Sequence, residues 1–385
     1  MKALHFGSGN IGKGFIGYLL NRTGYEVCFV DVNPGMVDRL NEHHSYTIEI
    51  LDDEHRREVV SPVSALNSRL QENEVLQAIV QADLVTTSVG VSNLPRIAPL
   101  IARGLGLRER AGGKKLDIIA NENAINASSI LKREIEKLVT PEGMERIRAF
   151  TGFPNSAIDR LALSRQSEEG EIALVEPFYE WVINRSEMVN ACLPPIREVE
   201  YVDDLQPYIE RKLFIVNMGH ATAAYLGFLT GAPTIQKALE RPEIENFVRK
   251  VMEESSRYIA GKYDISRDEL ERFVEKTIRR FRNQNISDDV LRVGRSPIRK
   301  LGYGERFITP VRMLFEGGYP TEYLTCAIAA GFLFSNPEDE ESVRIQEDIE
   351  TYGIEETVAS FTGIEDRELR LRIIEDYQHL RKLYR

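Results

Sequence analysis

Long apolar runs and clustered cysteines are both missing from this chain of 385 residues. No apolar stretch approaches the roughly 20 residues that a membrane-spanning helix needs. The three cysteines, Cys28, Cys192 and Cys326, lie far apart and show no spacing typical of zinc ligands or of a disulfide framework. The opening MKALHFG reads as a strand and not as a secretion signal. We therefore expect a cytoplasmic protein with no metal site.

Positive charge is also in short supply. The chain has 49 Lys and Arg residues against 60 Asp and Glu residues, which gives a formal net charge of −11. Such a field repels nucleic-acid phosphates and anionic lipid surfaces, so we expect neither nucleic acid nor membrane as a partner. Nothing in the sequence indicates an obligate protein partner. An anionic ligand would need a local cluster of basic residues.

A glycine-rich turn follows the first predicted strand. The run GSGNIG leads from the strand ALHF into a helical run that continues to Leu20. In such a strand–turn–helix unit the first glycine permits the tight turn, the second lets a pyrophosphate approach the backbone, and the third lets helix and strand pack closely. The helix N-terminus then offers free N–H groups to the phosphates. The predicted phosphate-binding residues are Gly7, Ser8, Gly9, Asn10, Ile11 and Gly12.

An acidic residue ends the second predicted strand. Asp31 lies 19 positions after Gly12, where its carboxylate can accept hydrogen bonds from ribose hydroxyls. The same carboxylate would repel a 2′-phosphate, which favours NAD over NADP as the cofactor. The alternative interpretation is a glycine turn in an unrelated α/β unit.

Two later strands end in small or amide residues. ADLVTTSVG ends in Ser88, Val89 and Gly90, which are suited to lie beside a nucleotide, and KLDIIANENA leads into Asn121, Glu122 and Asn123. Ligands of open α/β sheets bind at the carboxyl ends of the strands, which places Asn123 near a nicotinamide. Simple capping of the following helix explains the same residues equally well.

The pattern of apolar residues changes along the chain and predicts two domains. Strands and helices alternate in the first half, with SYTIEIL and REVVSPV as an inserted β-hairpin, whereas the apolar period becomes helical from about Asp203. Between Ile147 and Glu187, AFTGFPNSAIDR and EIALVEPFYEWVI read as strands that finish the sheet, and Arg160 suits a structural corner as well as a site wall. We predict an α/β protein: a Rossmann-type dinucleotide-binding domain over residues 1–190 and a mostly α-helical substrate domain over residues 191–385.

One apolar helix carries three polar side chains. In KLFIVNMGHATAAYLGFL, residues 212–229, a rotation of about 100° per residue puts Asn217 about 140° and His220 about 80° from Lys212. All three then share the buried side of the helix, where unpaired polar groups are costly. A lysine at a helix start and a satisfied core histidine are the ordinary interpretation of such residues. Beside a dinucleotide domain, a catalytic site is the favoured interpretation.

The three side chains suit the oxidation of an alcohol by NAD. A base must take the hydroxyl proton while hydride leaves the carbon, and an amine at Lys212 can do so if burial and nearby positive charge lower its pKa. Amide groups of Asn123 and Asn217 could stabilise the developing alkoxide, and His220 could hold the substrate oxygens.

Several segments together resemble one enzyme family. FGSGNIGKGFIG, FPNSAIDR, EPFYEW, KLFIVNMGHATAAYLG and RVGRSPIRKLG occur in the order found in the polyol-specific long-chain dehydrogenase/reductase family. The resemblance implies a metal-independent reaction with Lys212 as general acid/base and with Asn217 and His220 in the site. By motif position, the resemblance assigns the polarisation of the reacting oxygen to Asn123. The family has Cys where this chain has Asn121, so Asn121 is a second candidate for this role, and Asn123 is favoured.

The resemblance also implies a phosphorylated substrate, mannitol 1-phosphate or fructose 6-phosphate. LRVGRSPIRKLG supplies a local basic cluster for that phosphate, namely Arg292, Arg295, Arg299 and Lys300. A solvated basic turn paired with acidic neighbours is the alternative for this cluster. For the whole chain, the alternatives are a family relative that acts on an unphosphorylated polyol or a hexuronate, and a non-catalytic NAD-binding sensor.

Overall fold

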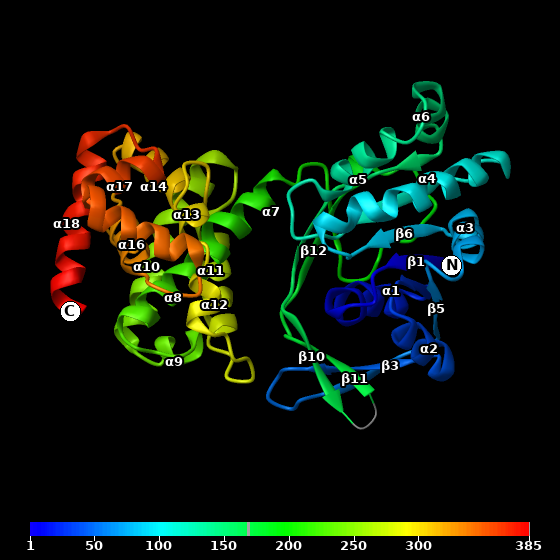
Figure 1. The fold of residues 1–385 in the computed structure, drawn as a ribbon, viewed down its shortest axis with the longest axis horizontal. Coiled ribbons are helices and arrows are strands. Elements are labelled where there is room, and N and C mark those ends of the chain that lie inside the picture. Colours follow the sequence, from blue (N-terminus) through cyan, green and yellow to red (C-terminus); the bar gives the residue numbers. More distant parts are fainter. Residues whose placement is uncertain (168–169, 385) are drawn as a thin grey trace. The chain divides into compact units, whose positions relative to one another are not determined.

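The structure, a computed structural model, describes residues 1–167 and 170–384 and divides into two compact units, Met1–Leu205 and Gln206–Arg385 (Figure 1). The first unit ends at Leu205, beyond the domain boundary at residue 190 that the sequence predicts. The reason is strand pairing, because β13 (Glu200–Val202) forms a parallel ladder with β12 (Glu180–Asn184).

A six-stranded sheet forms the centre of the first unit. The strand order is β5-β2-β1-β6-β7-β8, and each neighbouring pair is parallel. This is the order of a doubly wound dinucleotide-binding fold, which confirms the predicted Rossmann-type domain. The strands in chain order are β1 (Lys2–Phe6), β2 (Glu26–Asp31), β5 (Val63–Asn67), β6 (Leu84–Thr87), β7 (Leu116–Ala120) and β8 (Thr151–Gly152).

Helices cover both faces of this sheet, as the apolar clusters show. One cluster joins the sheet to a short π-helical segment, η1 (Gly12–Gly17), and to α1 (Tyr18–Thr23) and α2 (Pro34–His43). The other cluster contains α3 (Glu72–Gln81), α4 (Leu94–Arg110), α5 (Ala127–Glu136) and α6 (Pro141–Arg148). Burial on both faces explains why the strands read as nearly continuous apolar runs.

The predicted hairpin insertion is confirmed. β3 (Tyr46–Ile50) pairs antiparallel with β4 (Arg57–Val60), and β10 (Ala162–Ser167) and β11 (Gly170–Val175) extend them to a four-stranded sheet. The structure ends the hairpin at Val60, because the rest of REVVSPV leads into β5 of the central sheet.

The segment after Ile147 finishes the parallel sheet only in part. β8 is its sixth strand, but β9 (Ser156–Asp159) joins β12 and β13 in a separate three-stranded sheet. Arg160 is buried there, and its guanidinium donates to the carbonyls of Gly14 and Glu176. This arginine is therefore a structural corner.

The second unit is helical throughout its described part, apart from one isolated bridge between Thr234 and Asp289. One apolar cluster runs through the helices, which confirms the predicted mostly α-helical domain. No helix among the described residues is long and apolar enough to cross a membrane. The elements are α7 (Gln206–Arg211), η4 (Lys212–Asn217), α8 (Met218–Leu229), α9 (Ile235–Leu239), α10 (Pro242–Lys262), α11 (Arg267–Phe281), α12 (Val290–Gly294), α13 (Pro297–Lys300), α14 (Ile308–Glu316), α15 (Glu322–Leu333), α16 (Glu340–Tyr352), α17 (Ile354–Thr362) and α18 (Arg367–Tyr384).

A buried carboxylate on α10 makes the stability of this unit pH-dependent. Glu254 accepts hydrogen bonds from the backbone N–H groups of Tyr323 and Leu324 at the start of α15, and burial raises its pKa from 4.5 to about 7. A raised carboxyl pKa favours the folded state at low pH, and this contribution is lost as the pH rises from 4.5 through 7. We expect the free energy of unfolding to fall by about 3 kcal/mol across that window.

Urea unfolding at pH 5 and pH 8 measures this effect. Glu254→Gln removes the titrating group and should make the pH dependence clearly shallower, whereas Glu253→Gln, a partly exposed neighbour that pairs with Lys250, should leave it as in the parent. Equal slopes for all three proteins would contradict the assignment.

Candidate active site

Of the three glycines in the turn between β1 and η1, the fold requires Gly7 and Gly12, whereas it has space for a larger residue at Gly9. Gly7 has φ +101°, and a Cβ there would lie 2.7 Å from the carbonyl oxygen of Ser88. A Cβ at Gly12 would lie 2.0 Å from the carbonyl oxygen of Gly7. At Gly9, by contrast, a Cβ would meet no described atom within 4 Å. The fold does not require glycine at this position, but the close approach of a ligand would.

Asp31 is held at the tip of β2 by the same turn. Its Oδ2 accepts hydrogen bonds from the backbone N–H and the hydroxyl of Ser8, at 2.8 and 2.7 Å, and its Oδ1 accepts one from the N–H of Asn33 at 3.0 Å. Burial alone would raise the pKa of Asp31, but these hydrogen bonds outweigh it and hold the pKa below its usual value. The carboxylate is thus ionised and fixed in place. Ser8 contributes to the turn by binding Asp31.

His5, which sequence analysis did not identify, lies in β1 next to the glycine turn and contacts β6 and the loop that follows it. His5 is fully buried in β1, with Nδ1 2.7 Å from the hydroxyl of Thr86 and Nε2 2.9 Å from that of Ser88. Burial lowers the pKa of His5 to about 3, so the ring stays neutral. A single histidine within an apolar strand gave no sign of this network.

The three residues after β7 have different environments. The Glu122 carboxylate accepts hydrogen bonds from the N–H groups of Val89 and Gly90, so it fixes the loop after β6. Asn121 is buried, and its amide oxygen accepts a hydrogen bond from the Ser156 hydroxyl at 2.8 Å. Asn123 is exposed. Of the two asparagines, only Asn123 therefore presents its side chain to solvent.

The turn residues fit a bound dinucleotide. Gly9 is exposed and Asn10 and Ile11 are half-buried, at the start of a helix whose first N–H groups have no partners within the helix. The fixed carboxylate of Asp31 lies at the end of the neighbouring strand. When bound here, NAD would be held by the N–H groups of the turn and by Asp31.

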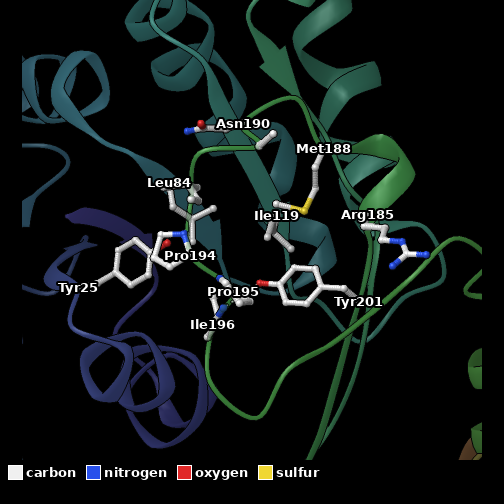
Figure 2. Close-up of a pocket in the computed structure, with 12 residues that line it drawn as sticks. Tyr25, Leu84, Ile119, Arg185, Met188, Asn190, Pro194, Pro195, Ile196 and Tyr201 are labelled. Atoms are coloured by element: carbon white, nitrogen blue, oxygen red, sulfur yellow. Dashed lines mark hydrogen bonds between the residues drawn. The ribbon is translucent and has the colours of Figure 1, made fainter.

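The first unit also has a pocket that is separate from the glycine turn. A pocket of about 310 Å³ lies between the sheet and the segment 185–201. Its lining is mostly apolar and includes Tyr25, Leu84 and Met188 (Figure 2). Tyr25 directly precedes β2 and Leu84 is the first residue of β6, whereas the glycine turn follows the carboxyl end of β1. None of the predicted site residues lines this pocket.

In the second unit, the polar helix is not a regular α-helix. Residues 212–217 form the π-helical segment η4, whose wider turn continues directly into α8. In a π-helical turn, hydrogen bonds join residues five apart, so each residue rotates the chain by less than the assumed 100°. Lys212 and Asn217, which are five apart, therefore lie closer to the same face of the helix than predicted. The predicted helix is confirmed, but its predicted geometry was wrong at this segment.

The three polar residues also lie on the accessible side of this helix. From residue 212 to residue 227, all side chains are buried except those of Lys212, Leu213, Asn217 and His220, which are half-buried. The expectation that they face the buried side is therefore wrong. The apolar majority packs into the core, and the remaining stripe offers an amine, an amide and an imidazole.

His220 has a defined environment. Its ring stacks on Phe281 with the ring centroids 4.8 Å apart, and its Nε2 lies 2.8 Å from Oδ2 of Asp288. The other carboxylate oxygen of Asp288 contacts the guanidinium of Arg292. Sequence analysis did not identify Asp288, because no spacing linked it to a histidine 68 positions earlier.

The four basic residues of the predicted phosphate cluster separate in the structure. Lys300 is buried, and its ammonium donates to the carbonyls of Val293 and Arg295, which removes it from a ligand's reach. Burial and the neighbouring arginines lower its pKa to about 7. Arg292 binds Asp288, and Arg299 lies 3.8 Å from Glu305. Arg295 is exposed, and among the described residues its guanidinium has no acidic partner within 4.0 Å.

The described residues contain no group of three or more His, Cys, Asp or Glu side chains that could hold a metal ion.

Comparison with known proteins adds two matches to family models. The model described as the mannitol dehydrogenase Rossmann domain matches residues 1–196, and the model described as the mannitol dehydrogenase C-terminal domain matches residues 204–380. The matches together cover both units.

Curated relatives resemble the chain over nearly its whole length. A mannitol-1-phosphate 5-dehydrogenase of Halalkalibacterium halodurans is 45% identical over 94% of this chain and 96% of its own. One from Thermoanaerobacter pseudethanolicus is 40% identical over 100% and 99%, and one from Enterococcus faecalis is 43% identical over 96% and 95%.

Solved structures share the fold at low sequence identity. A mannitol 2-dehydrogenase of Pseudomonas fluorescens, in a ternary complex with NAD and D-mannitol, has a TM-score of 0.74 at 18% identity and covers 100% of this chain and 92% of its own. A D-sorbitol dehydrogenase in substrate-free form has a TM-score of 0.84 at 16% identity, with 99% and 93% covered.

Proposed function

The chain belongs to the mannitol dehydrogenase family, and from this premise we propose that it interconverts mannitol 1-phosphate and fructose 6-phosphate with NAD and without a metal ion. The identity of 40–45% to mannitol-1-phosphate 5-dehydrogenases over nearly full length carries the proposal. The accessible stripe of Lys212, Asn217 and His220 supports it chemically.

The first unit supplies the cofactor site in this proposal. The residues assigned to it are those of the glycine turn, Asp31, and the loop of Ser88, Val89 and Gly90. Because Asp31 is ionised and fixed, it accepts hydrogen bonds from the ribose and disfavours a 2′-phosphate, so NAD is preferred over NADP. The bound NAD supplies the hydride chemistry.

The chain's own contribution is to move a proton and to stabilise charge. During oxidation the amine nitrogen of Lys212 takes the proton of the substrate hydroxyl while the carbon gives up its hydride, and in reduction Lys212 returns the proton. The amides of Asn123 and Asn217 donate to the oxygen as negative charge develops on it. His220 holds a neighbouring substrate hydroxyl. Asn123 is preferred to Asn121 because the Asn121 amide already binds Ser156.

Oxidation of NADH with fructose 6-phosphate as substrate, in the presence of a chelator, tests the proposed function. We expect turnover that chelation leaves unchanged and that is much slower with fructose. Faster turnover of fructose or of a hexuronate would assign the chain to another substrate within the family. NADH binding without turnover on any of these substrates would indicate a sensor.

The phosphate of the substrate is assigned to Arg295, with Arg299 beside it. Because a guanidinium binds phosphate through paired hydrogen bonds, we expect Arg295→Ala to raise the KM for fructose 6-phosphate at least about tenfold, a loss of about 1.4 kcal/mol. The KM for NADH should change by less than about twofold. Steady-state kinetics measure both constants, with Arg372→Ala on α18 as a matched surface control. Equal increases in both constants would remove Arg295 from the phosphate site.

A further inference from the structure

The imidazole of His220 contacts groups from two other parts of the second unit. Phe281, the last residue of α11, stacks on the ring at an interplanar angle of 19°. Asp288, in the loop before α12, approaches Nε2 to 2.8 Å, at an angle outside that of a hydrogen bond in this structure. A small rotation of the ring would align the N–H with the carboxylate.

Asp288 is itself fixed by the surrounding chain. Its backbone N–H donates to the side-chain oxygen of Gln236 at 3.1 Å, and its carbonyl accepts a hydrogen bond from the N–H of Ile235 at 2.8 Å. Its side chain is 11% exposed, and Arg292 occupies the carboxylate oxygen that does not face His220. Both the backbone and the charge of this aspartate therefore have partners, so it is a rigid acceptor.

A fixed carboxylate at one ring nitrogen determines the state of the other. When Nε2 carries the proton and faces the carboxylate, Nδ1 is left as the acceptor of the neutral ring. Such an acceptor suits the hydroxyl of a polyol. The stacked Phe281 limits rotation of the ring out of this orientation.

We propose that Asp288, held in place by Arg292, is a positioning residue that sets the tautomer and orientation of His220. The inference rests on the proposed function, because it assigns His220 to a substrate hydroxyl. It also gives Arg292 a role other than phosphate binding. The basic cluster then divides into Arg292, which acts through Asp288, and Arg295, which faces solvent.

Kinetics of a mutant cycle test the inference. Asp288→Asn keeps the shape of the side chain but removes its charge, and we expect kcat to fall about 10- to 100-fold, as for other residues that orient a functional histidine. The KM for NADH should stay within about twofold. Because Asp288 acts through His220, the double variant His220→Ala/Asp288→Asn should be no slower than His220→Ala alone. Additive losses in the double variant would overturn the proposal.

Two further variants separate positioning from folding and from phosphate binding. Asp289→Asn, at the neighbouring position, keeps the cap of α12 and should retain parental kcat. Arg292→Gln should lower kcat with little change in the KM for fructose 6-phosphate. An increase in that KM alone would return Arg292 to the phosphate site and contradict its role behind Asp288.

Nitrogen NMR of the imidazoles provides a readout that does not depend on activity. The chain has six histidines, so the His220 signals can be assigned by comparison with His220→Ala. We expect the Nε2–H tautomer in the parent and a mixture of tautomers in Asp288→Asn. An unchanged tautomer in the variant would overturn the inference. A parent that shows this tautomer but does not turn over fructose 6-phosphate would refute the proposed function and leave the Asp288–His220 pair intact.

Discussion

Replacement of Lys212 by alanine is expected to lower kcat by about 1,000-fold, the middle of the range that general acid–base catalysis contributes. The physical reason is the loss of the amine that, in the proposed mechanism, exchanges a proton with the substrate oxygen. Steady-state oxidation of NADH with fructose 6-phosphate measures kcat, and NADH fluorescence measures cofactor affinity. The dissociation constant of NADH should change by less than about threefold, because the glycine turn that we propose binds the cofactor belongs to the first unit.

A second lysine serves as the control for this experiment. Lys237→Ala removes an amine of the same unit that pairs with Glu240 on the surface, so parental kcat is expected. If Lys212→Ala kept more than about one tenth of the parental kcat, Lys212 would not be the general acid/base. A variant that lost kcat and NADH affinity together would point to a disrupted structure instead.

Two of the three glycines of the glycine turn, Gly9 and Gly12, should respond to alanine in opposite ways. Gly9→Ala adds a methyl group where no described atom lies within 4 Å, and Gly9 does not have a positive φ. We therefore expect parental thermal stability. The methyl group would occupy the space through which a pyrophosphate approaches, so the dissociation constant of NADH should rise at least about tenfold, a loss of about 1.4 kcal/mol.

Gly12→Ala provides the contrast within the same turn. Its Cβ would lie 2.0 Å from the carbonyl oxygen of Gly7, which the backbone can relieve only by moving. Alanine is usually the better helix former, but here the clash outweighs that gain, and we expect a loss of stability of about 3 kcal/mol. Thermal melting and NADH titration of both variants check the pair. Unchanged NADH affinity in Gly9→Ala would place the pyrophosphate elsewhere.

The central features of the first unit could be predicted because their signals are local in the sequence. A strand, a glycine turn and a helix occupy about 20 consecutive positions, and two of the three glycines, Gly7 and Gly12, meet requirements of backbone geometry that the structure shows. The alternation of strands and helices and the hairpin insertion follow from apolar patterns of the same kind, whereas the order of the strands in the sheet comes from the structure.

The environments of the site residues could not be predicted in the same way. Asn121 and Asn123 are the same residue type two positions apart, and the structure distinguishes them by burial and by the contact of Asn121 with Ser156, 35 positions further along the chain from Asn121. Lys300 reads like its neighbouring arginines, yet its ammonium lies in the core and binds backbone carbonyls. In each case the deciding partner is distant in the chain or is a backbone group.

The sequence by itself determined the class of each unit, the residue types of the glycine turn and the spacing of Lys212, Asn217 and His220, because these depend on local geometry and on periodic burial. Only the tertiary structure decided which side of the helix those three residues occupy and which groups hold His220. The π-helical segment 212–217 changes the directions of Lys212 and Asn217, and Asp288, 68 positions from His220, contacts the His220 ring. The physical reason is that a side chain's exposure and its partners are set by packing between elements, and residue spacing along a single element carries no record of that packing.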